Sequence, residues 1–278
     1  MDEILRIEGL KQHFVSGKGI FKSGYVVKAV DGVSFSVSRG ETLGLVGESG
    51  CGKSTLGRTI LKLYEPTEGK IYFEGLDITA YSVKKTRPLR KDMQIVFQDP
   101  MESLNQRHTV GMILEEPFII HNIGTPKQRK EWVKELLVKV ELPESAVLRY
   151  PHEFSGGQRQ RIGIARAIAL KPKLLICDES VSALDVSVQA QILNLLLQLQ
   201  QEMDLAMIFI SHDLSVVKNI SDRVAVMYRG KIVELGGVKE IYESPQADYT
   251  KTLLAAIPVT HPRERTRKKP ARVNEHVA

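Results

Sequence analysis

The chain has 278 residues, a formal net charge of +6 and a hydrophobic content of 42%. This length and apolar content suit one large α/β domain with an inserted or appended lobe. No apolar run approaches the ~18 residues needed to cross a bilayer, and the first residues lack the basic-then-apolar pattern of a signal peptide. The sequence therefore predicts a protein that is neither exported nor membrane-spanning.

The charge distribution and the two cysteines further limit the kinds of protein that this sequence could encode. Much of the positive excess lies in residues 259–278, where six basic residues face two acidic ones. Such a segment is typical of a disordered, solvated tail; weak contact with anionic lipid headgroups is the functional alternative, and nucleic acid comes after it. Cys51 and Cys177 have no metal-ligand spacing. They indicate a reducing compartment and predict packing roles rather than redox chemistry.

The first third of the chain is predicted to be rich in strands. Residues 4–14 and 33–37 favour strands, and the stretch 11–25 contains a Gly/Lys-rich loop. Residues 41–46 form an apolar run that suits a buried strand, and 69–75 favour a hairpin strand.

A glycine-rich motif follows the apolar run at 41–46 and precedes helical spacing at 55–63. It fits the phosphate-loop pattern, in which backbone N–H groups cradle nucleotide phosphates at a helix N-terminus. Lys53 is predicted to reach the β- and γ-phosphates, and the Ser54 hydroxyl to bind Mg²⁺. The predicted nucleotide-binding residues are Gly47, Glu48, Ser49, Gly50, Cys51, Gly52, Lys53, Ser54 and Thr55.

The pattern becomes helical over 104–171, with a helix predicted at 128–140. Trp132 on this helix is expected to pack in the core. The following order of strand 174–177, helix 188–201 and strand 206–210 implies a parallel sheet.

Polar residues end three predicted strands, where open α/β sheets bind ligands. After strand 174–177, Asp178 is predicted to hold Mg²⁺ and Glu179 to act as general base; a plain helix-terminus charge is the alternative. His212 follows the strand at 206–210 and is predicted to contact the γ-phosphate or the attacking water. Gln98 follows another apolar strand, and its amide is a candidate ligand for metal or water.

A second phosphate-binding helix end is predicted at Ser155, Gly156, Gly157 and Gln158. One chain with two such ends can serve two nucleotides if another subunit faces it.

Over roughly residues 3–258, the chain resembles the ATP-binding subunit of an ABC transporter. The motifs that carry this resemblance are residues 47–54, Gln98, 154–158, 174–179, 182–185 and His212. The resemblance implies a P-loop NTPase fold of the α/β class, with a mixed β subdomain, a RecA-like parallel sheet and an inserted helical subdomain at about 99–170.

The resemblance also implies the cofactors ATP and Mg²⁺ and two subunits closing head to tail. Each ATP would then lie between one phosphate loop and the partner's Ser155 segment, with Asp185 in the loop that crosses the interface. Gln98 would link ATP to the membrane subunits. Phe14 is the expected adenine-stacking residue, with Tyr25 as the alternative.

Two segments indicate a subfamily. Residues 99–110 are similar to the corresponding segment of dipeptide, oligopeptide and nickel importers. The segment 244–258 is similar to part of their C-terminal extension, which we expect at about 234–258 in this chain. The chain departs from that pattern at Gln106, at 247–248 and at Phe154, none of which removes a catalytic group. Because no cysteine follows Cys177, an iron–sulfur site is not expected.

The resemblance implies the second, F-type ATPase subunit of an importer, at the cytoplasmic face of the membrane. Its expected partners are a non-identical ATPase subunit, two permease subunits and, indirectly, an extracytoplasmic substrate-binding protein. A soluble ATPase acting on nucleic acid or ribosomes would need a coiled-coil insertion, zinc cysteines or a duplicated cassette, and none is visible. A non-hydrolysing regulatory subunit is disfavoured because Glu179 and His212 are both present.

Overall fold

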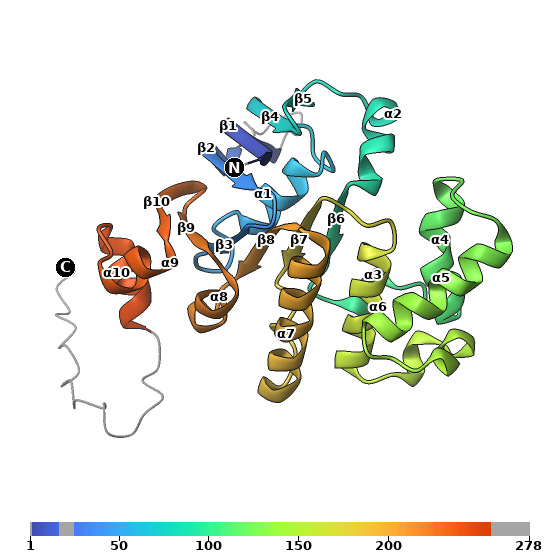
Figure 1. Cartoon of the computed structure of the whole chain (residues 1–278). Coiled ribbons are helices and arrows are strands. Elements are labelled where there is room, and N and C mark those ends of the chain that lie inside the picture. Colours follow the sequence, from blue (N-terminus) through green and yellow to red (C-terminus); the bar gives the residue numbers. More distant parts are fainter. Residues whose placement is uncertain (1, 17–24, 257–278) are drawn as a thin grey trace, which may run out of the picture.

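The computed structural model describes residues 2–16 and 25–256, which form two sheets and the helices around them (Figure 1). The smaller sheet is antiparallel, with the strand order β2, β1, β4, β5. Its strands are β1 (Glu3–Ser16), β2 (Tyr25–Ser38), β4 (Glu68–Phe73) and β5 (Leu76–Asp77).

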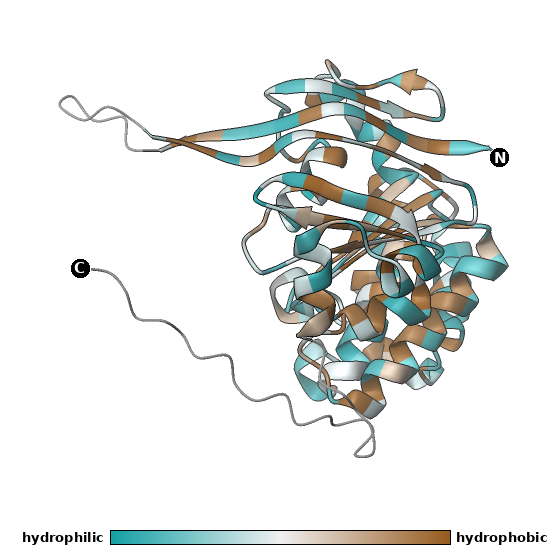
Figure 2. Ribbon diagram, turned by 90° about the vertical axis from the view of Figure 1, so that its left-hand side faces the viewer, coloured by the Kyte–Doolittle hydropathy of each residue, from teal (hydrophilic) through white to brown (hydrophobic). Residues whose placement is uncertain are grey.

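The hairpin of β1 and β2 is longer than the sequence predicts. The strand predicted at 4–14 is confirmed and runs from Glu3 to Ser16, whereas the strand predicted at 33–37 begins at Tyr25, so its predicted start was wrong. Pairing continues to Ser16 opposite Tyr25, but residues 25–28 are exposed on both faces and give no alternating apolar signal. The paired ends project beyond the neighbouring elements (Figure 2). Residues 17–24, within the stretch predicted to contain a loop, lie outside the described residues.

The larger sheet has the strand order β10, β9, β3, β8, β7, β6. All neighbouring strands are parallel except β10, which runs antiparallel to β9 at the edge. The parallel sheet predicted from the alternation of strands and helices is confirmed, whereas β9 and β10 were not anticipated. The strands are β3 (Thr42–Val46), β6 (Met93–Val96), β7 (Leu174–Asp178), β8 (Ala206–Ser211), β9 (Arg223–Tyr228) and β10 (Lys231–Gly237).

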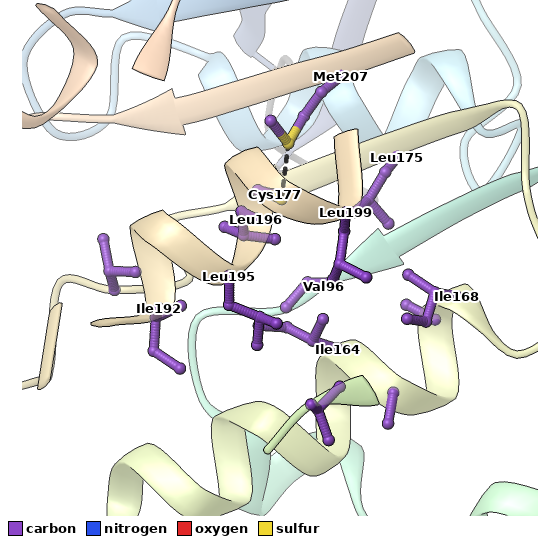
Figure 3. Packing of buried hydrophobic residues seen from close by; sticks show 14 of the residues in the cluster. Val96, Ile164, Ile168, Leu175, Cys177, Ile192, Leu195, Leu196, Leu199 and Met207 are labelled. Atoms are coloured by element: carbon purple, nitrogen blue, oxygen red, sulfur yellow. Dashed lines mark hydrogen bonds between the residues drawn. The ribbon is translucent and has the colours of Figure 1, made fainter. Parts of the chain in front are cut away.

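Each face of the larger sheet packs against a different layer. On one face, Ile176 and Ile208 pack with Leu56 of helix α1 (Lys53–Ile60) and with the smaller sheet. On the other face, Cys177 and Met207 pack against α6 (Gly156–Ile168) and α7 (Val186–Met203) (Figure 3). The same cluster includes residues of α8 (Leu214–Ile220). Complete burial raises the pKa of the Cys177 thiol to about 12, which agrees with its predicted packing role. Both faces of β7 and β8 are thus covered, as their unbroken apolar runs require.

Residues 99–170 contain helices but no strand, and all of them are described. The elements are α3 (Pro100–Ser103), α4 (Val110–Ile120), α5 (Pro126–Lys139), two 3₁₀ turns (Glu144–Leu148 and Pro151–Glu153) and α6. Helix α5 begins at Pro126 rather than at 128, because Thr125 and Gln128 form a capping box. Trp132 packs on Phe118 with ring centroids 5.1 Å apart, as predicted for a core residue.

Four short elements complete the described chain: α2 (Val83–Thr86), a 3₁₀ turn (Arg87–Lys91), α9 (Val238–Glu243) and α10 (Asp248–Ala255). The predicted basic tail, 259–278, lies outside the described residues. Within residues 2–16 and 25–256, no helix combines the length and the apolar character needed to cross a bilayer.

Candidate functional site

The glycine-rich loop joins β3 to α1 at the carboxyl edge of the larger sheet (Figure 1). Gly52 occupies the position before α1 with φ +113°, a conformation that side-chain-bearing residues rarely adopt. A Cβ there would also collide with the backbone carbonyl of Ala29 in β2. The tight loop therefore depends on glycine at this position, both for its dihedral angle and for its approach to β2.

Lys53 is held inside this loop, with only 4% of its surface exposed. Its ammonium group donates to the carbonyl oxygens of Gly47 (2.8 Å) and Glu48 (3.0 Å). A buried charge of this kind needs such partners. The arrangement concentrates positive charge in the hollow of the loop, where a phosphate group can bind.

Asp178 ends β7 and meets the start of α1. The Ser54 hydroxyl donates to Asp178 Oδ1 at 2.7 Å, and Arg58 Nη2 lies 3.9 Å from Asp178 Oδ2. Burial raises the pKa of the Asp178 carboxyl above its ordinary value, while the bond from Ser54 and the charge of Arg58 oppose that effect. A paired hydroxyl and carboxylate are oxygen donors of the kind that Mg²⁺ prefers.

Glu179 and His212 follow the ends of neighbouring strands β7 and β8. The Glu179 backbone N–H donates to the carbonyl of Ile210 at 3.0 Å, which fixes the turn after β7 beside β8. His212 Nδ1 lies 3.4 Å from Glu179 Oε2. Only 15% of the Glu179 side chain is exposed, against 53% for His212. The histidine can therefore reach a bound ligand while it contacts the carboxylate.

Gln98 follows β6 at the same edge. Its side-chain N–H donates to the Ser182 hydroxyl over a long 3.4 Å, and that hydroxyl donates to the backbone carbonyl of Glu179 at 2.9 Å. The glutamine is exposed and only loosely held. Ser182 thus joins the turns after β6 and β7.

The loop, Gln98 and Glu179 border a pocket of about 570 Å³, whereas Asp178 and His212 are not among its lining residues. Phe14 lines it and packs edge-on against Tyr64, with centroids 5.4 Å apart, whereas Tyr25 is not among the lining residues. The remaining predicted residues on its wall are Ser49, Gly50, Cys51, Gly52, Lys53, Ser54, Thr55, Gln98 and Glu179. The structure therefore brings most predicted nucleotide-binding residues to one pocket.

The Ser155 segment does not line that pocket. Ser155 caps α6, accepting from the Gln158 N–H at 3.3 Å while the Gln158 side chain accepts from the Ser155 N–H at 3.0 Å. Ser155, Gly156 and Gln158 are exposed, and Gly157 is buried. Asp185 is also exposed, before α7 and without a capping hydrogen bond from its side chain. Gly156 lines a neighbouring pocket of about 490 Å³ together with Ser54 and Asp178.

Sequence reasoning missed the wall of the phosphate-loop pocket formed by β2 and the turn after β9. The Gly230 N–H donates to the carbonyl of Cys51 at 2.9 Å, so this turn supports the loop directly. β2 belongs to the smaller sheet and β9 to the larger one, so packing between the two sheets brings these segments together, and no local motif marks them. The missed residues are Val27, Lys28, Ala29, Arg229 and Gly230.

The model of the ABC transporter family matches residues 30–182, more than half of the chain. The chain belongs to the ABC transporter family. It is 57% identical over 264 residues to the oligopeptide transport ATP-binding protein AppF of Bacillus subtilis, covering 94% of this chain and 80% of that protein. It is 54% identical over 273 residues to OppF of the same organism, covering 96% and 88%.

A solved dimeric structure of the ATP-binding cassette MJ0796, in a post-hydrolysis state with ADP and Pi, superposes with a TM-score of 0.75. It is 26% identical, and the match covers 84% of this chain and 99% of that one. The predicted ABC ATPase fold and the resemblance to importer ATPases are therefore confirmed. The chain is an ATP-binding, ATP-hydrolysing ABC transporter subunit.

Proposed function

We propose that this ATPase energises the import of oligopeptides into a bacterial cell. The observation that carries the ATPase part is the meeting of Lys53, Asp178, Glu179 and His212 around one phosphate loop. The cargo is inferred from relatives named for oligopeptide transport at 57% and 54% identity. These names favour peptides over nickel, the alternative cargo.

Each polar group has a proposed role. Lys53 exchanges its two carbonyl partners for the β- and γ-phosphates, and the loop N–H groups bind the same phosphates. Glu179 accepts the proton of the attacking water, and His212 beside it contacts that water or the γ-phosphate. Phe14 lines the pocket and stacks on adenine there. The neighbouring Tyr64 packs edge-on against the Phe14 ring and holds it in place.

The same edge of the sheet fits a magnesium ion. Ser54 and Asp178 already lie 2.7 Å apart through their oxygens, and the buried carboxylate has little water to compensate its charge. Gln98 would complete this set. Bound there, Mg²⁺ would neutralise charge on the transferred phosphate.

The exposed Ser155 segment is proposed to bind the nucleotide of a partner ATPase subunit, because it lies outside the chain's own phosphate-loop pocket. Asp185 would cross the same interface. We further propose that residues 99–170 contact two permease subunits, which bind the ATPase pair to the cytoplasmic face of the membrane, and that an extracytoplasmic protein delivers peptide. ATP binding would close the pair, and hydrolysis would reopen it.

The decisive experiment is uptake of labelled dipeptides, oligopeptides and Ni²⁺ by cells that carry Glu179→Gln, together with ATP hydrolysis by the purified transporter. We expect hydrolysis to fall by about 10²- to 10⁴-fold, with ATP still bound, and peptide uptake alone to be lost. Glu131→Gln is the matched control, since Glu131 is exposed on α5 and makes no ion pair within the described residues. Undiminished hydrolysis would exclude Glu179 as the base, and unchanged peptide uptake would exclude this cargo.

A further inference from the structure

The end of the described chain returns to the phosphate loop. After β10 and α9, helix α10 carries Tyr249, whose hydroxyl oxygen accepts a hydrogen bond from the backbone N–H of Glu48 at 3.2 Å. The two residues are 201 positions apart in the sequence. A C-terminal side chain is therefore part of the support of the loop.

The ring of Tyr249 is fixed by its neighbours. It packs against Tyr228 with centroids 4.2 Å apart and an interplanar angle of 37°, and it borders the larger hydrophobic core. Tyr228 ends β9, directly before Arg229 and Gly230 on the pocket wall. Burial raises the pKa of the Tyr249 hydroxyl above its ordinary value, which is already well above neutral.

The start of α10 is fixed as well. The carboxylate of Glu234 in β10 accepts hydrogen bonds from the backbone N–H groups of Gln246 (2.7 Å) and Ala247 (3.1 Å). These bonds fix the chain just ahead of Tyr249 to the edge of the larger sheet. The hydroxyl of Tyr249 is thus presented to the loop from a rigid base.

Glu48 transmits this contact to the nucleotide site. Its N–H group points to Tyr249, while its carbonyl oxygen accepts from the ammonium group of Lys53 at 3.0 Å. Tyr249 therefore holds the residue whose other backbone group positions the phosphate-binding lysine.

We propose that Tyr249 is a positioning residue of the nucleotide site, through which the C-terminal segment 231–256 sets the affinity of the phosphate loop for ATP. The inference rests on the proposed binding of ATP at this loop. Without the hydroxyl, the loop must be ordered by the nucleotide itself, and this cost weakens binding.

The test compares Tyr249→Phe with Tyr228→Phe in the full-length chain. Both remove one hydroxyl from the same ring pair and keep the tilted ring contact, but the Tyr228 hydroxyl makes no hydrogen bond within the described residues. Titration calorimetry with MgATP and MgADP measures affinity, and steady-state hydrolysis gives KM and kcat. For Tyr249→Phe we expect Kd and KM to rise by about two- to tenfold, as for the loss of one hydrogen bond, with kcat unchanged.

Hydrogen exchange at the Glu48 amide provides a second readout, because this N–H loses its acceptor only in Tyr249→Phe. We expect the Glu48 amide to exchange faster in Tyr249→Phe than in wild type or Tyr228→Phe. Equal nucleotide affinity in all three proteins, or equal losses in both variants, would overturn the inference. If wild type itself bound no ATP, the proposed function would fail instead, so the two failures are distinguishable.

Discussion

At the scale of single residues, the site is defined by buried charges that already have partners. Lys53 is held by two backbone carbonyls, and Asp178 by Ser54 and the more distant Arg58. Because desolvated charges are costly without hydrogen bonds, these contacts keep the side chains at the loop before any ligand binds. The nucleotide then replaces weaker partners rather than ordering free side chains.

Gly52→Ala tests how strictly the loop needs glycine. The substitution puts a side chain at φ +113° and against the carbonyl of Ala29, so we expect a loss of about 1–3 kcal/mol in unfolding free energy and weaker ATP binding. Urea denaturation and ATP titration measure the two effects. The control is Gly163→Ala inside α6, where an added Cβ meets nothing within 4 Å. It should be neutral or stabilising by about 0.5–1 kcal/mol; a Gly52→Ala protein as stable as wild type would contradict the argument.

At the scale of elements, the ends of strands position most polar residues of the site, and the start of a helix supplies the rest. The carboxyl ends of β6, β7 and β8 bring Gln98, Asp178, Glu179 and His212 to one edge, while the first turn of α1 supplies Ser54. The C-terminal elements pack beside this edge, where the Glu234 carboxylate of β10 accepts hydrogen bonds from the backbone just ahead of α10. Docking of α10 therefore depends on a carboxylate.

Glu234→Gln tests this dependence. Burial alone would raise the pKa of Glu234, but the Gln246 and Ala247 N–H groups, together with the nearby Thr250 hydroxyl and Lys251 charge, outweigh it, and the net pKa is lowered from 4.5. Since the folded-state pKa is depressed, the stabilisation is fully present above 4.5 and is lost as the pH falls through the folded-state value. We expect Glu234→Gln to lose about 1 kcal/mol near neutral pH.

Thermal unfolding of wild type and Glu234→Gln across a pH series measures this effect. The difference between their melting temperatures should shrink as the pH drops below 4.5, because wild-type Glu234 then becomes neutral too. Glu243→Gln, an exposed change on α9, is the control. A difference independent of pH would show that the carboxylate charge is not what holds α10.

At the scale of the whole molecule, the proposed function assigns this chain two halves of different nucleotide sites. Its phosphate loop lies in one pocket, and the exposed cap of α6 at Ser155 lies outside it. The solved structure of the similar cassette MJ0796 is dimeric. A head-to-tail pair is the arrangement that would use both halves.

Ser155→Arg tests the pair directly. In a Glu179→Gln chain mixed with its partner ATPase subunit, we expect ATP to produce a stable dimer on size-exclusion chromatography. Adding Ser155→Arg should abolish that dimer, since a bulky side chain would fill the exposed cap that we propose binds the partner's nucleotide, yet leave ATP binding by the single chain unchanged. Ser145→Arg, on another exposed turn, is the control. ATP-dependent dimers that survive Ser155→Arg would rule out the head-to-tail pair.

The sequence alone determined the phosphate loop, the carboxylate pair after β7 and the parallel sheet. These features are local: a loop conformation depends on glycines a few positions apart, and the apolar runs at 174–177 and 206–210 already require burial on both faces. A helix end near Ser155 was predicted as well, because a cap acts within one turn, although α6 begins at Gly156, two residues before the predicted start at Gln158.

The tertiary structure decided what depends on chain segments far apart. Whether Phe14 or Tyr25 borders the pocket follows from the length and register of the β1–β2 hairpin, whose exposed end carries no apolar alternation. The supports from Gly230 and Tyr249 arise where distant segments fold against the loop, and neither residue carries a motif. The spacing of residues within a motif determines the conformation of a loop or helix end. Which side chains from distant segments complete the site is decided by how the sheets and helices pack.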